Sequence, residues 1–464
     1  MHSGRMTPDA PAPRIAPGRS GGAPPGSEHA GAGGPLAFTF GSWFTWTAVG
    51  VAFPALGLSL VSVSGLLARD AYDAFPVVAV THIATLGWAT MTIMGAAMQM
   101  APALLGARVR GEPAIPWLYA LCALCVLTVV VGLAAVRPGW AAAGGAGVNL
   151  ACWWFVLLLV RTIAAAGPRG SVVSPHVPVA LLCLLLVLLW GVVLALNLQW
   201  GFWPALRVGH RGLLVHLSLG LGGFLGMMVV GVFYRLVPLV HGARVADPRR
   251  GWGILALGVL AIAAALAGVA GSAAGAFRLA AAAAAGALLL FAWEVLHVLG
   301  HRRTRAPDLN VSHWHAGAAY SIVLAGVGTG WALGGLRSTP ADRLGECVVV
   351  LFLFGWVTQA VIGQLYKVTP FLMWYYRATI PDVLAIPRQP ALYAPPLGRA
   401  VLWLSNAGVA ALAAGIWAGV PWIARGGAAL IAAAAFLLAY LLAYRWVPPA
   451  AAGRLVFQWR WRIS

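Results

Sequence analysis

The chain has 464 residues, of which 61% are hydrophobic and only 9% are charged, and its formal net charge is +19. This composition lies outside the range of soluble domains, so most side chains must face lipid or other buried helices. It therefore excludes a soluble enzyme. The basic residues lie mainly between the apolar stretches, a placement that sets membrane topology and argues against nucleic-acid binding.

A Pro- and Gly-rich segment at 1–35 lacks a continuous apolar run and is predicted to be a disordered cytoplasmic tail, not a cleaved signal peptide. After it, about twelve windows reach the roughly 20 mainly apolar residues that a membrane-spanning helix needs. Their long unbroken runs favour helices over the alternating strands of a β-barrel. The windows are 41–67, 75–104, 115–136, 142–166, 178–202, 212–240, 252–270, 276–299, 311–334, 345–373, 399–420 and 426–446.

Lys and Arg residues fall mostly on one side of these spans, the side that carries both termini. By the positive-inside rule this side is cytoplasmic. The sequence thus predicts a multi-pass protein of the bacterial cytoplasmic (inner) membrane. Both termini are expected in the cytoplasm, with a basic tail at 449–464 and membrane lipids as partners.

One template recurs in the second, sixth and tenth spans: Gly, then Trp or Phe, six residues, Gly, six residues, Pro. Successive copies are 136 and 132 residues apart, which predicts an internal repeat of four helices. The expected fold is an all-α integral membrane domain (36–448) with three pseudo-symmetric four-helix arcs, at about 36–170, 171–305 and 306–448. The template positions are Gly87, Trp88, Gly95 and Pro102; Gly223, Phe224, Gly231 and Pro238; and Gly355, Trp356, Gly363 and Pro370.

The template residues have a physical interpretation. Glycines let membrane helices approach closely, and the closing proline is expected to end or kink its helix near the cytoplasmic surface. A tyrosine followed by a basic residue recurs in two copies, as Tyr234-Arg235 and Tyr366-Lys367. These pairs are expected to anchor their helices at the interface, with the basic side chains reaching outward.

Two stretches carry a resemblance to a known family. THIATLGW, with His82, and VHLSLGLGGFLG, with His216, resemble the second and sixth helices of subunit I of the heme-copper oxidases and nitric oxide reductases. The likeness covers the architecture of most of residues 40–447 and is specific only in the second, sixth and tenth helices. It implies that His82 binds a low-spin heme b and that His216 binds copper, another metal or heme, in respiratory or nitric-oxide-related electron chemistry.

The directions of these two histidines can be compared. Relative to their template glycines, His82 and His216 are offset by two residues, which is about 200° around a helix. We therefore expect the two imidazoles to point into different arcs, as the separate heme and copper sites of the family imply. The alternative role of each is an ordinary core histidine, hydrogen-bonded to a neighbouring helix.

The chain departs from the family's pattern at the other ligands. The family carries a His-x-His pair on its tenth helix, whereas GECVVVLFLFGW has Val348 and Val350 at the corresponding positions. The family also has adjacent histidines on its seventh helix, and none occurs at 251–271. These differences predict a divergent member, similar to the NO-response protein of denitrifiers or to subunit I of the cbb3-type oxidases, and not a complete proton-pumping oxidase.

A second set of polar residues is expected at the cytoplasmic ends of the sixth, eighth and ninth spans. Carboxylate and imidazole groups on neighbouring helices are ligands for zinc, iron or copper, so the set is a candidate metal site. Glu294 has Arg302 as an alternative partner, and histidines at helix ends are often only solvated. The set consists of Glu294, His297 and His301, which share a helix face, with His313, His315 and His241.

The remaining acids and bases of interest are expected on the periplasmic side. Glu346 opens the tenth span and is either interfacial or part of a proton route. Asp70 and Asp73 are expected to be solvated in a loop. His210 and Arg211 precede the sixth span and are expected to meet solvent or a heme propionate.

Five cysteines lie within apolar spans. Two of them form a C-x-x-C surrounded by leucine and valine, so we expect inert packing groups and not a metal or redox site. The cysteines are Cys122, Cys125, Cys152, Cys183 and Cys347.

Three functions remain open from the sequence. The first is a heme b protein of electron chemistry, an oxidoreductase if it is an enzyme, which receives electrons from partner subunits or a quinol. The second is a transporter of a metal or small molecule that uses the cytoplasmic histidines. The third is a structural or assembly subunit without cofactors. A bound heme, a bound metal without heme, or a colourless metal-free protein would distinguish the three.

Overall fold

The computed structural model describes residues 35–167, 173–207, 210–243, 246–303, 305–334, 341–376 and 395–444. The tail expected at 1–35 lies outside these residues, apart from Pro35, where the first described helix begins. The basic tail expected at 449–464 lies outside them as well. No strand occurs among the described residues, which confirms the all-α prediction.

Each predicted span corresponds to a helix, and the observed ends fall within a few residues of most predicted ones. Five spans contain a π-helical segment (η), and short 3-10 turns precede α6 and α9. The spans are α2–η1–α3 (Pro35–Thr47, Ala48–Ala52, Phe53–Leu67), α4–η2–α5 (Phe75–His82, Ile83–Thr90, Met91–Leu105), α6 (Ile115–Ala134), α7 (Pro138–Ala165), α8 (His176–Trp200), α9–η7–α10 (Arg211–Leu217, Ser218–Gly226, Met227–His241), α11 (Pro248–Gly271), α12 (Ala274–Gly300), α13 (Leu309–Ala332), α14–η8–α15 (Ala341–Val350, Leu351–Val357, Thr358–Tyr376), α17 (Pro395–Ala418) and α18–η10 (Pro421–Leu438, Ala439–Tyr444).

Within the described ranges, eleven helices are long and apolar enough to cross a membrane, as judged by length and composition. The remaining helix, α13, corresponds to the ninth predicted span. It has 24 residues but falls short in apolarity because it carries Asn310, His313 and His315 near its start. The chain is therefore compatible with a multi-span membrane protein.

Local signals set several helix ends. Pro138, Pro248 and Pro421 begin α7, α11 and α18, where the missing backbone N–H has no intrahelical partner to lose. Asp247 caps α11, since its carboxylate accepts a hydrogen bond from the Arg249 backbone N–H at 2.9 Å. Prolines and a capping aspartate therefore define where these helices begin.

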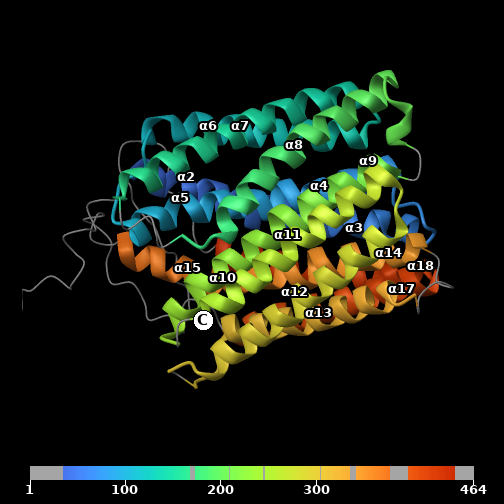
Figure 1. Cartoon of the computed structure of the whole chain (residues 1–464). Coiled ribbons are helices and arrows are strands. Elements are labelled where there is room, and N and C mark those ends of the chain that lie inside the picture. The colour runs from blue at the N-terminus through green and yellow to red at the C-terminus, as the bar shows by residue number, and fades with distance from the viewer. Residues whose placement is uncertain are drawn as a thin grey trace, which may run out of the picture.

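The helices lie side by side in one elongated bundle (Figure 1). Chain neighbours pack together, as in α6 with α7, α11 with α12 and α17 with α18. The last span also packs against the first, through α18 and α3. In Figure 1, α5, α10 and α15 lie toward one end of the bundle, here called the proline end because Pro102, Pro238 and Pro370 lie there. Toward the opposite end lie α4, α9 and α14.

The three helices that contain the template, here called the template helices, share a π-helical segment at the same place. The Gly-aromatic pairs Gly87-Trp88, Gly223-Phe224 and Gly355-Trp356 lie within η2, η7 and η8. π-Helical segments are rare and occur often at functional sites. Their recurrence at matched positions shows that the repeated residues adopt a repeated local conformation.

The first template glycines permit close helix packing, as predicted. A β-carbon built on Gly87 would lie 3.2 Å from the Ala52 side chain, on Gly223 2.6 Å from the Cys183 sulfur, and on Gly355 2.5 Å from the Tyr320 ring. In each case the neighbour belongs to the preceding span, so each template helix packs against the helix before it through the same glycine.

The template prolines do not end their helices, so the first of the two expected effects, an end or a kink, is not observed. Pro102 and Pro238 lie inside α5 and α10, which each continue for three residues beyond the proline. Gly106 and Gly242 then stop these helices with φ of 61° and 55°, left-handed conformations that glycine adopts without a steric penalty. Pro370 likewise lies inside α15, which continues to Tyr376.

Candidate functional site

His82 is the last residue of α4, immediately before the π-helical segment η2. Its Nδ1–H donates a hydrogen bond to the carbonyl oxygen of Val78, 2.8 Å away on the preceding turn. Because a carbonyl can only accept, this bond assigns the proton to Nδ1 and leaves Nε2 with a free lone pair. Metal-binding histidines are commonly fixed in the same way, with one ring nitrogen donating to a carbonyl and the other available as a ligand.

His216 occupies the equivalent region of the sixth span, in α9 just before η7. Its Nδ1 is buried and has no hydrogen-bond partner. The ring lies against Gly191 of α8, where a built β-carbon would come within 3.1 Å of the imidazole Cε1. A buried ring nitrogen without a partner is costly in an apolar bundle, so this side chain is a candidate ligand of a metal or cofactor.

The two imidazoles face one another. Their ring centroids are 6.1 Å apart and their planes are inclined by 36°. The expectation that His82 and His216 point into different arcs is therefore wrong. The 200° offset compares each residue with its own glycine, but the side of α4 that faces α9 is not equivalent to the side of α9 that faces α4. The same offset can therefore turn the two side chains toward each other.

This separation has chemical meaning. A metal–imidazole nitrogen bond is about 2 Å long, so two imidazoles on opposite sides of one metal ion have ring centroids roughly 6 Å apart. The observed 6.1 Å is close to that distance. The pair of His82 and His216 is therefore a candidate pair of ligands for one heme iron or one other metal ion.

The tenth span adds no third histidine to this pair. Val350 is buried and Val348 packs against the same apolar core. The second and tenth spans are instead connected by a hydrogen bond, in which the Trp88 indole N–H donates to the Thr358 hydroxyl at 3.2 Å. Among the described residues, no three His, Cys, Asp or Glu side chains gather in a way that could hold a metal ion.

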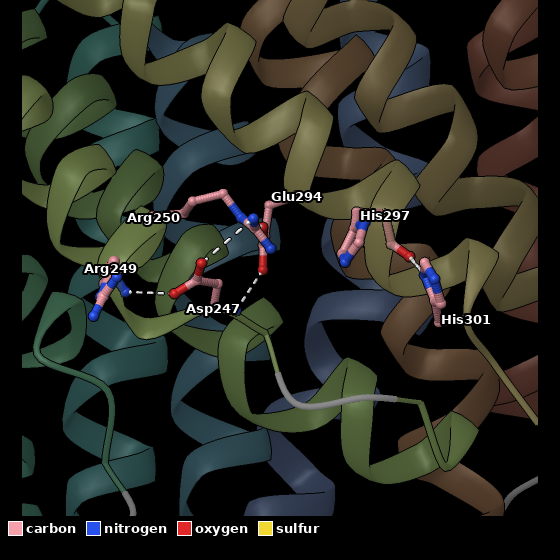
Figure 2. Close-up of polar contacts among 6 residues, drawn as sticks. All are labelled: Asp247, Arg249, Arg250, Glu294, His297 and His301. Atoms are coloured by element: carbon pink, nitrogen blue, oxygen red, sulfur yellow. Dashed lines mark hydrogen bonds and ion pairs between the residues drawn. The ribbon is translucent and has the colours of Figure 1, made fainter.

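At the proline end, Glu294 is engaged by a different partner from the one expected. It is fully buried, and its carboxylate forms an ion pair with Arg250 and accepts a hydrogen bond from the Asp247 backbone N–H at 2.7 Å. Figure 2 shows Arg250 and Asp247 around this carboxylate. The alternative pairing with Arg302 is wrong, because Glu294 faces α11. Its two oxygens already have partners, which leaves little capacity for a metal.

The histidines expected to join Glu294 lie in separate environments. The rings of His297 and His301 have centroids 4.5 Å apart and planes inclined by 47°, and they lie apart from the Glu294 ion pair (Figure 2). His313 is fully buried and its Nδ1 contacts the Gln359 amide oxygen at 2.6 Å. His315 is exposed on α13, and the His241 ring contacts the Asn310 amide oxygen at 2.7 Å.

The tyrosine–basic pairs do not extend toward an interface as expected. Tyr366 is 2% exposed and stacks on His313, and Tyr234 stacks on His176. Lys367 forms an ion pair with Asp308, with nitrogen and oxygen 2.5 Å apart. Each of these groups is used inside the bundle because a neighbouring helix offers it a partner.

The opposite end carries two links between distant loops and helices. Asp70 is not simply solvated, since it forms an ion pair with Arg343 at 2.9 Å. Tyr72 lies 2.8 Å from the Nε2 of His210, and desolvation, reinforced by Asp342 and Asp73, raises the pKa of Tyr72 to about 12. The Tyr72 hydroxyl therefore stays neutral at physiological pH.

Three other residues of this region can also be placed. Arg211 donates a hydrogen bond to the Ser272 hydroxyl. Glu346 is 5% exposed, and neither of its carboxylate oxygens has a hydrogen-bond partner. Glu346 is thus buried and not interfacial. All five cysteines are free thiols, and all but Cys125 are buried.

Sequence reasoning missed Gly191 and Arg250. Gly191 lies in a run of leucines and valines in which nothing indicates a contact with His216. Arg250 is one of two adjacent arginines at the start of α11, and only its position opposite α12 singles it out. Comparison of the sequence with known proteins found no matching family model and no similar curated protein.

Proposed function

We propose that this chain is a membrane heme b protein of electron chemistry, with His82 and His216 as the two axial ligands of one heme. The observation that supports this proposal is the facing pair of imidazoles at 6.1 Å, one with its tautomer fixed and the other with an unpartnered ring nitrogen. Neutral imidazoles are standard axial ligands of heme b. A heme held in this way supplies a one-electron carrier within the bundle.

The resemblance to subunit I of the heme-copper oxidases and nitric oxide reductases enters the proposal in a modified form. The family's ligand pattern uses the tenth helix, where this chain has Val348 and Val350. We infer that His216 replaces the missing tenth-helix ligand and is not part of a copper site. The recurring π-helical segments and first-glycine contacts support three arcs of four helices.

If both histidines held the heme iron, the group would supply one-electron transfer, and the proposal assigns the chain that role and not oxygen reduction. The roles of this chain's residues are specific: Val78 orients the His82 ring through its carbonyl, and Gly191 leaves room for the His216 ring.

The test is an optical spectrum of the full-length protein, purified in mild detergent from heme-replete cells, with His82→Ala and His216→Ala beside it. The wild type is expected to show a reduced α-band at about 560 nm and one heme per chain, as six-coordinate heme b does. Each alanine variant should lose the low-spin spectrum. His297→Ala, at the proline end, is the matched control and should retain it.

Three results would contradict the proposal in different ways. A colourless wild-type protein would show that the chain binds no heme. Loss of the spectrum in His82→Ala alone would exclude His216 as a ligand. Stoichiometric copper or zinc in a heme-free protein, lost in both variants, would replace the heme by a single metal ion at the same histidine pair.

A further inference from the structure

A cavity of about 220 Å³ lies between the three template helices in their proline-end halves. The cavity is partly open to the outside of the bundle, and its volume is larger than one water molecule needs. Equivalent faces of the three helices build its wall. One residue after each second template glycine lie Ala96, Val232 and Gln364, and five residues after it lie Met100, Leu236 and Val368.

The wall is almost entirely apolar. Met100, Leu236 and Val368 belong to one buried cluster with Leu372, and α7 adds Phe155 and Leu159. A lining of methyl, methylene and aromatic groups offers no hydrogen bonds to a polar ligand. It therefore suits an alkyl chain.

Gln364 is a polar exception in this wall. Its side chain is 8% exposed, and neither the amide oxygen nor the amide nitrogen has a hydrogen-bond partner. The equivalent positions on the other two template helices carry Ala96 and Val232, so packing at this position does not require an amide. A buried amide without partners is destabilising unless something else satisfies it.

Arg235 is the second exception. Its equivalents on the other template helices are Gln99, which donates to the Ser42 hydroxyl at 2.7 Å, and Lys367, which forms the ion pair with Asp308. Arg235 takes part in none of the ion pairs formed by described residues, and its Nε is buried without a partner. A cation on a cavity wall without a counter-charge calls for an anion.

Trp314 of α13 supplies a further donor. It also lines the cavity, is 1% exposed, and its indole N–H has no partner. Three lining residues thus carry unpartnered N–H groups, and one of them is positively charged. This donor set favours a ligand whose polar group is an anionic acceptor.

We propose that the cavity binds a long-chain carboxylate, with its alkyl chain between the template helices and its acidic head on Arg235, Gln364 and Trp314. An arginine and a carboxylate form charge-assisted hydrogen bonds, which are stronger than those to a neutral group. A neutral ligand would satisfy the amide but would leave the guanidinium without a counter-charge. The site is independent of the histidine pair.

The experiment measures equilibrium binding of radiolabelled palmitate to the detergent-purified full chain, freed of bound lipid by repeated detergent exchange. Saturable binding of one palmitate per chain is expected. Arg235→Gln should weaken it by about tenfold or more, since tenfold corresponds to a modest part of a charged hydrogen bond. Arg302→Gln is the matched control, a loss of the same charge outside the cavity, and should change the affinity less than about twofold.

Two further arms make the test independent of a folding defect in Arg235→Gln. Ala96→Met, which fills the cavity from an apolar position, should also abolish binding. Methyl palmitate and a decyl quinone, which lack the negative charge, should compete poorly. Equal affinity in Arg235→Gln and Arg302→Gln, or equal competition by the neutral compounds, would overturn the proposal, as would the absence of saturable binding. His82→Ala should bind palmitate normally, so failure of the heme proposal leaves this one testable.

Discussion

At Gly191, the absence of a β-carbon leaves space for the imidazole ring of His216. The His216 imidazole occupies the space that a side chain at position 191 would fill, with a built β-carbon only 3.1 Å from Cε1. That distance is shorter than ordinary carbon–carbon contact, so any larger residue must displace the ring by a few tenths of an ångström. Axial ligation depends on the ring position, so ligand binding should respond before folding does.

If the chain binds heme through His216 as proposed, Gly191→Ala should lower the heme content of the purified protein several-fold, while it costs about 1 kcal/mol of stability, at the low end for overpacked sites. Heme per chain from the optical spectrum and the thermal unfolding midpoint provide the two readouts. Gly326→Ala is a suitable control because a β-carbon there meets nothing within 4 Å. Unchanged heme content in Gly191→Ala would argue that His216 does not depend on this contact.

Each template helix packs closely against the preceding helix at both of its template glycines. On Gly355, an added β-carbon would lie within 2.5–2.8 Å of three ring atoms of Tyr320, a contact that requires the ring to move. Tyr320 belongs to α13, the least apolar of the twelve predicted spans. The contact between η8 and α13 therefore helps to fix the position of α13, for which burial of apolar surface in the membrane is a weaker driving force.

Gly355→Ala should accordingly destabilise the protein by about 1–3 kcal/mol, the usual cost of overpacking. Tyr320→Leu removes the ring that the new methyl group meets, so the double variant should recover part of that loss, as coupled neighbours do. Thermal unfolding of the wild type, both single variants and the double variant measures the coupling. Strict additivity of the two changes would refute the contact.

The charge distribution of the sequence predicts how the whole bundle is oriented in a membrane. Lys and Arg are concentrated on the side of the proline end, which the positive-inside rule assigns to the cytoplasm. Alkaline phosphatase, active only outside the cytoplasm, should be active when fused at Val136, between α6 and α7, and inactive when fused at Gly242, after α10. A fluorescent protein fused at the same two sites should give the opposite result. If both patterns were reversed, the bundle would have the opposite orientation in the membrane.

The span boundaries and the first-glycine contacts could be predicted from the sequence because both depend on local properties. Apolar runs of the right length form helices in a membrane whatever surrounds them. A glycine at a fixed helical position leaves a gap that a neighbouring helix can approach. The positions of His82 and His216, early in their spans, were visible for the same reason.

Contacts between spans of different units depend on how the whole bundle is arranged. The second and sixth spans meet through non-equivalent helix faces, so repeat arithmetic placed His82 and His216 in separate arcs although their rings lie 6.1 Å apart. The same bundle geometry pairs Glu294 with Arg250 and Lys367 with Asp308. Arg235, which occupies the template position of Lys367, lines a cavity instead. Helix formation is a property of each segment, whereas the partner of a buried charge is set by which segments pack together.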